Sequence, residues 1–264
     1  MLNLGVEGMM IIGAVAGFAA KAATGSYSLG FLAAMLAGAA MALLFGFLTQ
    51  VLMSNQVATG LALTLFGLGI SALVGQPFAG KTVGTFPRIA LTSQVTIDVV
   101  VLVAFAVTSA LAWFLARTRS GLILRAIGEN HDAAHAIGYP VVAVRLAALV
   151  FGGAMAGIGG AYLSLVQTPF WVEKMTAGRG WIALALVVFA GWRPGRALAG
   201  AYLFGGITIL QLHAQGAGLQ IDAQVLSMLP YLATIVVLVL MSRDASRLKL
   251  NAPQCLGKPF TAVA

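Results

Sequence analysis

The run VVAVRLAALVFGGAMAGIGGAYLSLVQ, from Val141 to Gln167, contains a single charged residue, Arg145. A helix needs about 20 predominantly apolar residues to cross the hydrocarbon core of a bilayer. Because backbone at membrane depth must satisfy its own hydrogen bonds, a run of this kind is a helix and not an open strand. The sequence therefore predicts a membrane-spanning helix here.

Seven further apolar stretches lie on either side of this run, at 9–20, 29–48, 57–75, 95–116, 180–191, 197–212 and 224–241. Three of them, 9–20, 180–191 and 197–212, are short, and we expect broken, re-entrant or half-buried helices there. Only 8% of the residues are charged, against about 25% in soluble domains. We therefore expect one all-α polytopic membrane domain over residues 1–264, with about eight helices and no soluble domain.

The net charge of +8 is explained by membrane topology better than by nucleic-acid binding. Alternate connections divide the basic residues into two groups. One group contains Arg117, Arg119, Arg125, Arg145, Arg193, Arg196, Arg243, Arg247, Lys249 and Lys258, and the other contains Lys21, Lys81, Arg88, Lys174 and Arg179. The positive-inside rule places the first group in the cytoplasm. The loop 117–140 and the tail 242–264 are then cytoplasmic, and the connections 76–94, 168–179 and 213–223 face outward.

The segment GQPFAGKT, Gly75 to Thr82, matches the phosphate-loop pattern letter for letter. That pattern binds phosphate only between a buried strand and a helix whose N-terminus points at the ligand. Here a membrane span precedes it, and VGTFPRIALT, with a proline and no helical period, follows it. We interpret the segment as an outward turn and not as an ATP site.

The sequence offers no catalytic or metal-binding constellation. His131 and His135 are four residues apart, but no third ligand is nearby, so a zinc site is not expected. The single Cys255 cannot form an internal disulfide. We therefore expect no cofactor in this chain and no enzymatic activity.

Small residues one helical turn apart allow helix backbones to approach closely. They occur as GAVAG, with Gly13 and Gly17, and as GAMAG, with Gly153 and Gly157. We expect these motifs to pack helices within the chain; self-dimerisation is the alternative.

The polar stretch ENHDAAHAIGYP, Glu129 to Pro140, interrupts the apolar pattern. Glu129 or Asn130 suits the start of a short helix, and Gly138 suits its end. The residues that we expect to contact a partner protein in the cytoplasm are Glu129, Asn130, Asp132, Ala133, Ala134 and Gly138. Ala133 and Ala134 give a low-profile surface that fits another protein's groove; a plain surface connector is the alternative.

An acid, two alanines, three residues and a glycine, Asp132 to Gly138, resemble the "EAA…G" loop of ABC importer permeases, with Asp132 in place of the usual Glu. The run TRSGLILRAIGENHDAAHAIGYPVVAVR is similar to the loop of the simple-sugar, nucleoside and branched-chain amino-acid class. LNLGVEGMMIIGA, SNQVATGLALTLFGLG and MTAGRGWIALALVVFAGWRPGRALAGAYLFG resemble the nucleoside and simple-sugar branch. These matches extend from Leu2 to about Gly206.

The resemblance implies a multi-pass permease subunit in the inner or plasma membrane of a prokaryote. It also implies a second permease subunit, identical or different, an external substrate-binding protein, and a cytoplasmic ATPase that holds ATP and magnesium. Nucleosides are the first expected substrate; pentoses or hexoses, and then branched-chain amino acids, are alternatives. Related permeases usually carry one more span before the NLGVEG run, so we expect that a helix is missing from the start of this chain or that this branch uses fewer spans.

Polar residues within the spans are candidates for the substrate pathway. They are Glu7, Asn55, Gln56, Thr59 and Thr64. Each of them could equally form a hydrogen bond between helices. An ion-coupled secondary carrier is the alternative of another class, but it would need buried ionisable residues at the midplane, and the sequence offers few.

Overall fold

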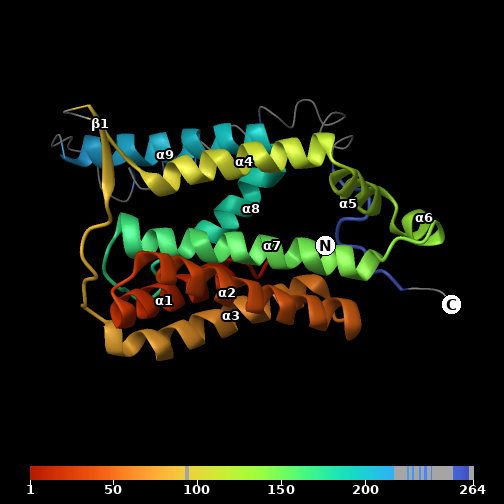
Figure 1. Ribbon diagram of the computed structural model, residues 1–264, viewed down its shortest axis with the longest axis horizontal. Coiled ribbons are helices and arrows are strands. Elements are labelled where there is room, and N and C mark those ends of the chain that lie inside the picture. The colour runs from red at the N-terminus through yellow and green to blue at the C-terminus, as the bar shows by residue number, and fades with distance from the viewer. Residues whose placement is uncertain are drawn as a thin grey trace.

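The computed structural model describes residues 1–92, 95–216 and 252–261, and six single positions between 225 and 239. Within these residues the chain forms nine α-helices, and six of them are long and apolar enough to cross a membrane (Figure 1). These six are α1 (Val6–Thr24), α2 (Tyr27–Gly46), α3 (Gln56–Gly75), α4 (Val99–Arg117), α7 (Val141–Tyr162) and α9 (Pro194–Gly216). The shorter helices are α5 (Arg119–Glu129), α6 (His131–Ala136) and α8 (Arg179–Phe189). The expected all-α membrane fold is confirmed.

Short non-α turns extend three of the long helices. A π-helical turn at Phe47–Val51 continues α2, a second at Leu163–Gln167 continues α7, and a 3₁₀ turn at Gln76–Phe78 continues α3. With its turn, α7 covers the 27 residues Val141–Gln167. The apolar run 141–167 is thus one continuous helical element.

Two of the stretches that we expected to be short form longer helices. The stretch 9–20 lies inside α1, which has 19 residues, and 197–212 lies inside α9, which has 23. Both expectations were wrong because polar residues at the ends of the apolar runs do not end the helices, which include Glu7 and Arg196. The stretch 180–191 was correctly expected to be short, since α8 has 11 residues. The stretch 224–241 lies outside the described residues apart from the six single positions.

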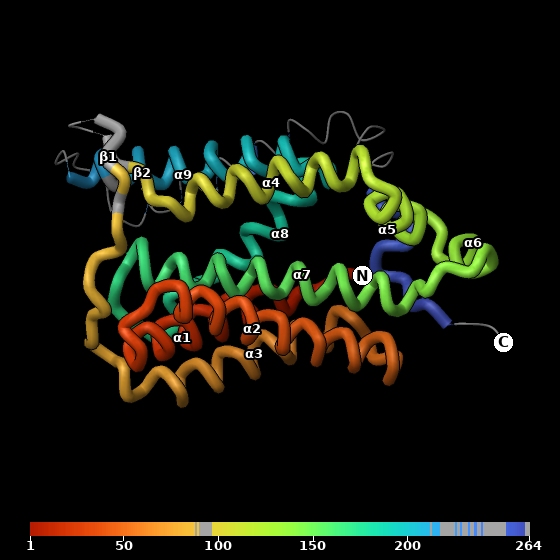
Figure 2. Tube along the Cα trace, in the orientation of Figure 1, coloured from red at the N-terminus to blue at the C-terminus, as the bar shows by residue number. Residues whose placement is uncertain are grey.

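The stretch 95–116 is not helical throughout. Its first four residues form strand β2 (Val95–Asp98), which pairs antiparallel with β1 (Arg88–Thr92) in a two-stranded hairpin, and α4 begins only at Val99. Val95, Thr96 and Ile97 are β-branched residues, which favour a pleated strand. The hairpin lies at one end of the helix bundle, and α5 and α6 lie at the opposite end (Figure 2).

The core of the bundle lies where α1, α2 and α7 pack together. A Cβ atom at Gly157 on α7 would collide with the carbonyl oxygen of Ala34 on α2, and one at Gly13 on α1 would collide with Gly157 itself. Close backbone approach of this kind requires glycine. The expectation that the small-residue motifs pack helices within the chain is therefore confirmed.

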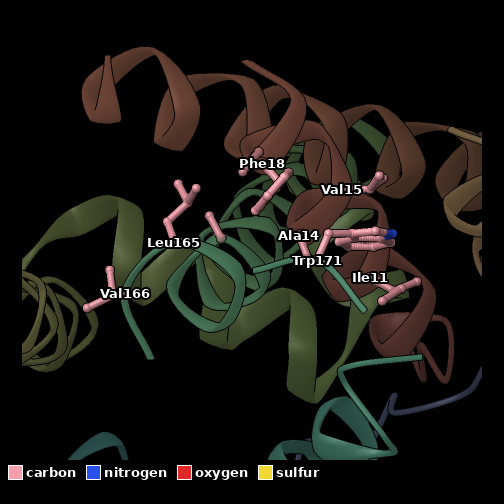
Figure 3. Packing of buried hydrophobic residues seen from close by; sticks show 9 residues of the cluster. Ile11, Ala14, Val15, Phe18, Leu165, Val166 and Trp171 are labelled. Atoms are coloured by element: carbon pink, nitrogen blue, oxygen red, sulfur yellow. The ribbon is translucent and has the colours of Figure 1, made fainter. Parts of the chain in front are cut away.

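Larger apolar side chains fill the remaining space beside this crossing. Figure 3 shows the cluster around Ile11, Val15 and Phe18 of α1, together with Leu165 and Trp171. The ring of Trp171 lies 6.4 Å from that of Phe18, centroid to centroid. Trp171 thereby fixes the start of the non-helical segment 168–178 against α1.

Helices α4 and α9 form a second layer, which α8 joins to the first (Figure 1). The rings of Phe105 on α4 and Tyr202 on α9 lie 5.1 Å apart. Among its described side chains α4 has none that is buried. Among the long helices, those that carry buried polar residues are α1, α3 and α7.

Candidate functional site

The polar stretch between α5 and α7 folds as the short helix α6, and its ends are capped as the sequence suggested. The side chain of Asn130 accepts a hydrogen bond from the backbone N–H of Ala133 at 3.0 Å, so Asn130 is the N-cap. Gly138 has a φ of +92° and ends the helix, and its N–H donates to the carbonyl of His135 at 2.8 Å. Glu129, the other candidate for the start of α6, is instead the last residue of α5.

The two faces of α6 differ in what covers them. Asp132, Ala133, Ala136 and Ile137 are exposed, and 74% of Ile137 is accessible. Ala134, which we expected on the contact surface, is only 3% accessible, because it packs against Ile127, Val141 and Phe260 of its own chain. The exposed surface of α6 therefore combines the polar Asp132 and His135 with an apolar part formed by Ala133, Ala136 and Ile137. Ile137 was missed in the sequence.

The preceding helix α5 is set at a fixed angle to α4. The hydroxyl of Thr118 accepts a hydrogen bond from the N–H of Gly121 at 3.0 Å and so caps α5. A Cβ atom at Gly121 would collide with the carbonyl of Phe114 on α4. The corner between the membrane helix and the α5–α6 pair is therefore tightly packed, and α5 and α6 stand outside the bundle at one end of the molecule (Figure 1).

Glu7, the first candidate for the substrate pathway, lies in the first turn of α1 and is 3% accessible. One carboxylate oxygen accepts hydrogen bonds from the hydroxyl of Thr176 and from the N–H of Gly178, at 2.9 Å for the latter. The other oxygen accepts from the N–H of Gly180 at 2.7 Å. Glu7 therefore binds the N-terminal end of α8, where a negative charge is favoured, and joins α1 to α8.

This contact changes the expected path of the connection 168–179. Its first residues do lie beside the connection 76–94, since Phe170 forms a bridge with Thr82. From Trp171, which packs on Phe18, the chain then returns along α1 as far as Glu7. These two positions of α1 are eleven residues apart, roughly 16 Å along a helix. The segment therefore runs back along α1 and does not stay at the end of the bundle where Thr82 lies.

The other four candidates lie at the start of α3 or within its first half and also have partners within the chain. Asn55 caps α3 by accepting from the N–H groups of Val57 and Ala58, at 3.0 and 3.1 Å. The hydroxyl of Thr59 lies 2.8 Å from that of Ser54. Asn55 and Thr59 thus both stabilise the turn that leads into α3.

Thr64 and Gln56 connect α3 to the N-terminal residues. The hydroxyl of Thr64 lies 3.3 Å from the carbonyl oxygen of Leu4, and the side-chain oxygen of Gln56 accepts from the N–H of Leu2 at 2.8 Å. The Nε2 atom of Gln56 is buried and has no hydrogen-bond partner in the part of the chain that the structure describes. Gln56 is thus the candidate that combines burial with unused hydrogen-bonding capacity.

The segment Gly75 to Thr82 does not have the geometry of a phosphate loop. Helix α3 precedes it in place of a strand, and an irregular chain follows it. The N–H of Lys81 donates to the carbonyl of Phe78 at 2.9 Å, and the Lys81 ammonium lies 5.7 Å from the centre of the Phe78 ring. The segment is therefore a turn. Separately, the described residues contain no group of three or more metal-binding side chains.

An apolar bundle of helices long enough to cross a membrane, with a short capped helix outside one end, defines a multi-pass membrane protein. The chain belongs to the family described as "Branched-chain amino acid transport system / permease component", whose profile matches residues 1–242.

Its relatives include permeases of ABC transporters. It is 38% identical to the "Putative glucose ABC transporter permease protein TsgC13" of Haloferax volcanii, over 98% of this chain and 89% of that protein. It is 34% identical to the "Nucleoside ABC transporter permease protein NupC" of Lactococcus lactis, over 91% of this chain and 83% of that one. It is 29% identical to the "Guanosine ABC transporter permease protein NupQ" of Bacillus subtilis, over 98% and 88%. No solved structure matches the chain.

The family confirms the resemblance seen in the sequence and decides against an ion-coupled carrier. The chain is the multi-pass permease of an ABC importer and a transport subunit, not an enzyme. Permeases of this kind hold no cofactor themselves, and they work with an ATPase and a substrate-binding protein.

Proposed function

We propose that this permease imports a solute that contains a sugar ring, with a simple sugar of the glucose type as the first candidate. The observation that carries the proposal is the 38% identity to a putative glucose permease over 98% of this chain. The sequence alone favoured nucleosides, and these remain the second candidate because of the 34% identity to a nucleoside permease. Both kinds of solute carry a ring with several hydroxyl groups, which a pathway lined by amide and hydroxyl side chains can bind.

Uptake by the complete transporter, reconstituted in vesicles with ATP inside, tests the substrate. We expect labelled glucose to accumulate, and we expect unlabelled guanosine not to compete with it. Accumulation of guanosine, with no effect of glucose, would assign the permease to nucleosides. Accumulation of neither solute would contradict the proposal for the substrate.

Gln56 is the residue that we propose first for contact with the solute along the pathway. Its buried Nε2 has no hydrogen-bond partner within the described residues, and buried polar groups normally have one. Gln56→Leu should raise the KM for uptake, whereas the neighbouring exposed Val57→Leu should not. If Gln56→Leu leaves the KM unchanged at full expression, Gln56 has only the structural contact with Leu2.

We further propose that α6 is the coupling helix, which the ATPase holds from the cytoplasmic side. The exposed surface of Ala133, Ala136 and Ile137 is small and apolar and stands outside the bundle. Movement of the ATPase would displace this helix and rock the permease between outward- and inward-facing states. Because α6 is capped at both ends by Asn130 and Gly138, it can move as one piece.

The test of coupling uses the exposed face of α6 and leaves Ala134 unchanged, because Ala134 is buried in the chain's own packing. Ala133→Trp enlarges the proposed contact, and overpacking a fitted surface typically costs about 1–3 kcal/mol. We expect this variant to reach the membrane normally and to co-purify poorly with the ATPase. Ala79→Trp makes the same change at an exposed alanine at the other end of the bundle and should co-purify normally. Equal co-purification of the two variants would show that α6 is only a surface connector.

The sidedness proposed from the basic residues needs its own test. On a Cys255→Ser background, a cysteine in place of Lys81 should react with an impermeant thiol reagent in intact cells. A cysteine in place of Arg125 on α5 should be shielded. Both native side chains are exposed, so a difference in labelling reports the side of the membrane. The reverse pattern would overturn the cytoplasmic placement of α5, α6 and the tail 242–264.

We propose a heterodimeric permease in a prokaryotic cell membrane. Two proteins of Haloferax volcanii, TsgC13 and TsgB13, are both named as glucose permeases, and this chain resembles both, at 38% and 30% identity. Two different permease chains in one transporter would explain that pair. Co-purification from cells that express this chain with two different tags tests the proposal, since recovery of both tags in one complex would indicate a homodimer.

A further inference from the structure

Residues 252–261, here called the tail brace, pack on the α5–α6–α7 region although they are more than 100 residues away in the chain. The N–H of Cys255 donates to the carbonyl of Gly128 at 2.9 Å, and its Sγ donates to the carbonyl of Glu129 at 3.2 Å. Both acceptors belong to the last turn of α5, where helix carbonyls lack an intrahelical partner. The tail brace therefore caps the end of α5 immediately before α6.

Phe260 supplies the apolar volume that holds α6 in place. It is 4% accessible and packs with Ile127 of α5, Ala134 of α6 and Val141 of α7. The rings of His131 and His135, both on α6, meet the Phe260 ring edge-on at 5.3 Å. One aromatic ring from the tail thus contacts all three helices.

Arg145 adds a polar connection at the same place. Its guanidinium is buried in the first turns of α7 and lies 2.7 Å from Nδ1 of His131, to which it donates. A second nitrogen of Arg145 donates to the carbonyl of Lys258 in the tail brace at 3.4 Å. The guanidinium also lies 6.0 Å from the centre of the Phe260 ring. Helix α6, the tail brace and α7 therefore meet at one side chain.

A helix as short as α6 does not hold its position alone. Six residues form fewer than two turns, and isolated helices shorter than about 12–15 residues are marginal in water. The buried side of α6 offers only Ala134 and His131, and neither is large. Its orientation relative to α7 therefore depends on the side chains packed around it, which include Phe260 and the Arg145 guanidinium.

Movement of α7 would in turn reach the core. Gly153 and Gly157 of α7 contact the backbone of α2 so closely that a Cβ atom would collide with it, and Gly160 contacts α1 in the same way. Such interfaces transmit displacement because they leave no space for adjustment.

We propose that the tail brace positions α6 on α7, so that Phe260, Arg145 and His131 transmit the displacement of the coupling helix into the membrane bundle. The proposal rests on the coupling function proposed for α6. In this arrangement the exposed face of α6 contacts the ATPase, and the buried face carries the movement onward. The tail brace then affects coupling, and not the docking of the ATPase.

Phe260→Ala in the complete transporter tests this role. We expect the ATPase to co-purify at the normal level, while solute taken up per ATP hydrolysed falls by at least about fivefold, the lower end of the usual coupling between two sites. Leu256→Ala is the matched control, because Leu256 is a half-buried apolar residue of the same segment outside the Phe260 cluster. It should leave the ratio unchanged, and Phe260→Tyr should retain most of the coupling.

Cys255 provides a readout that does not depend on transport. It is the single cysteine of the chain and is 8% accessible, so its reaction with a thiol reagent reports release of the tail brace. Phe260→Ala should increase the labelling rate, and Leu256→Ala should increase it much less. An unchanged labelling rate in Phe260→Ala, or faster labelling with normal uptake per ATP, would overturn the proposal.

The two proposals fail in different ways. If Ala133→Trp retains the ATPase, α6 is not the docking helix, whatever the tail brace does. If Ala133→Trp releases the ATPase but Phe260→Ala transports normally, docking by α6 stands and the tail brace has no role in coupling.

Discussion

Replacement of Glu7 tests whether this residue holds α1 to α8 or contacts the solute in the substrate pathway. Its carboxylate accepts hydrogen bonds from Thr176, Gly178 and Gly180. Thr176 and Gly180 are buried, whereas Gly178 is half-buried, so Glu7→Ala leaves two donors that water cannot reach. Each buried donor without a partner costs about 1–3 kcal/mol, so the expected loss of stability is about 2–6 kcal/mol.

Glu7→Gln should be milder, because the amide keeps one oxygen acceptor and places an NH₂ group against the remaining donor. With one donor left unpaired, the expected cost is about 1–3 kcal/mol. The order of thermal stability in detergent should therefore be wild type, then Gln, then Ala. Glu173→Ala removes an exposed acid from the same segment, 168–178, and should leave stability unchanged.

Uptake measurements decide between the two roles of Glu7. If Glu7 only holds α1 to α8, Glu7→Gln should lower the amount of folded transporter while the KM of the folded fraction stays near the wild-type value. A stable Glu7→Ala protein with a strongly raised KM would refute the reasoning. That result would mean that the hydrogen bonds to Thr176 and Gly180 contribute little and that the carboxylate contacts the solute.

Three further predictions concern other parts of the chain. Gly157→Leu should abolish expression of folded protein, because the added side chain collides with α2 and overpacking of cores costs about 1–3 kcal/mol or more. A Cβ atom at Gly152 on the same helix meets nothing within 4 Å, so Gly152→Leu should express normally, and equal expression of the two variants would contradict the packing. Lys81→Ala should transport normally, with ATP hydrolysis by the complex unchanged; loss of nucleotide binding by the isolated chain would restore the phosphate-loop interpretation. Burial of His131, with the charge of Arg145 beside it, lowers the pKa of the imidazole below its usual value of about 6.5. The packing of the tail brace on α6 is therefore favoured while His131 is neutral. It weakens as the pH falls below about 6.5, because protonation is easier in the released state. Labelling of the tail thiol, measured relative to the unfolded chain at each pH, should therefore rise on acidification, and a pH-independent ratio would contradict it.

The sequence by itself determined the class of fold and the family. Apolar runs as long as Val141–Gln167 permit only membrane helices, since no other spanning segment satisfies its own backbone. The caps of α6 were also readable, because Asn130 and Gly138 act through bonds to residues three or four positions away. The pairing of GAVAG with GAMAG could be expected in kind, because small residues at helical spacing indicate close packing wherever the partner lies.

The tertiary structure decided what lies opposite each of these residues. Ala133 and Ala134 are adjacent and identical in the sequence, yet one is exposed and the other is buried beneath Phe260. Glu7 is an isolated acid in an apolar run, and only the path of the segment 168–178 back along α1 brings its donors near Gly178 to it. Such partners are more than 100 residues apart in the chain, and no local pattern records a contact of that range, because its energy depends on how the intervening helices pack.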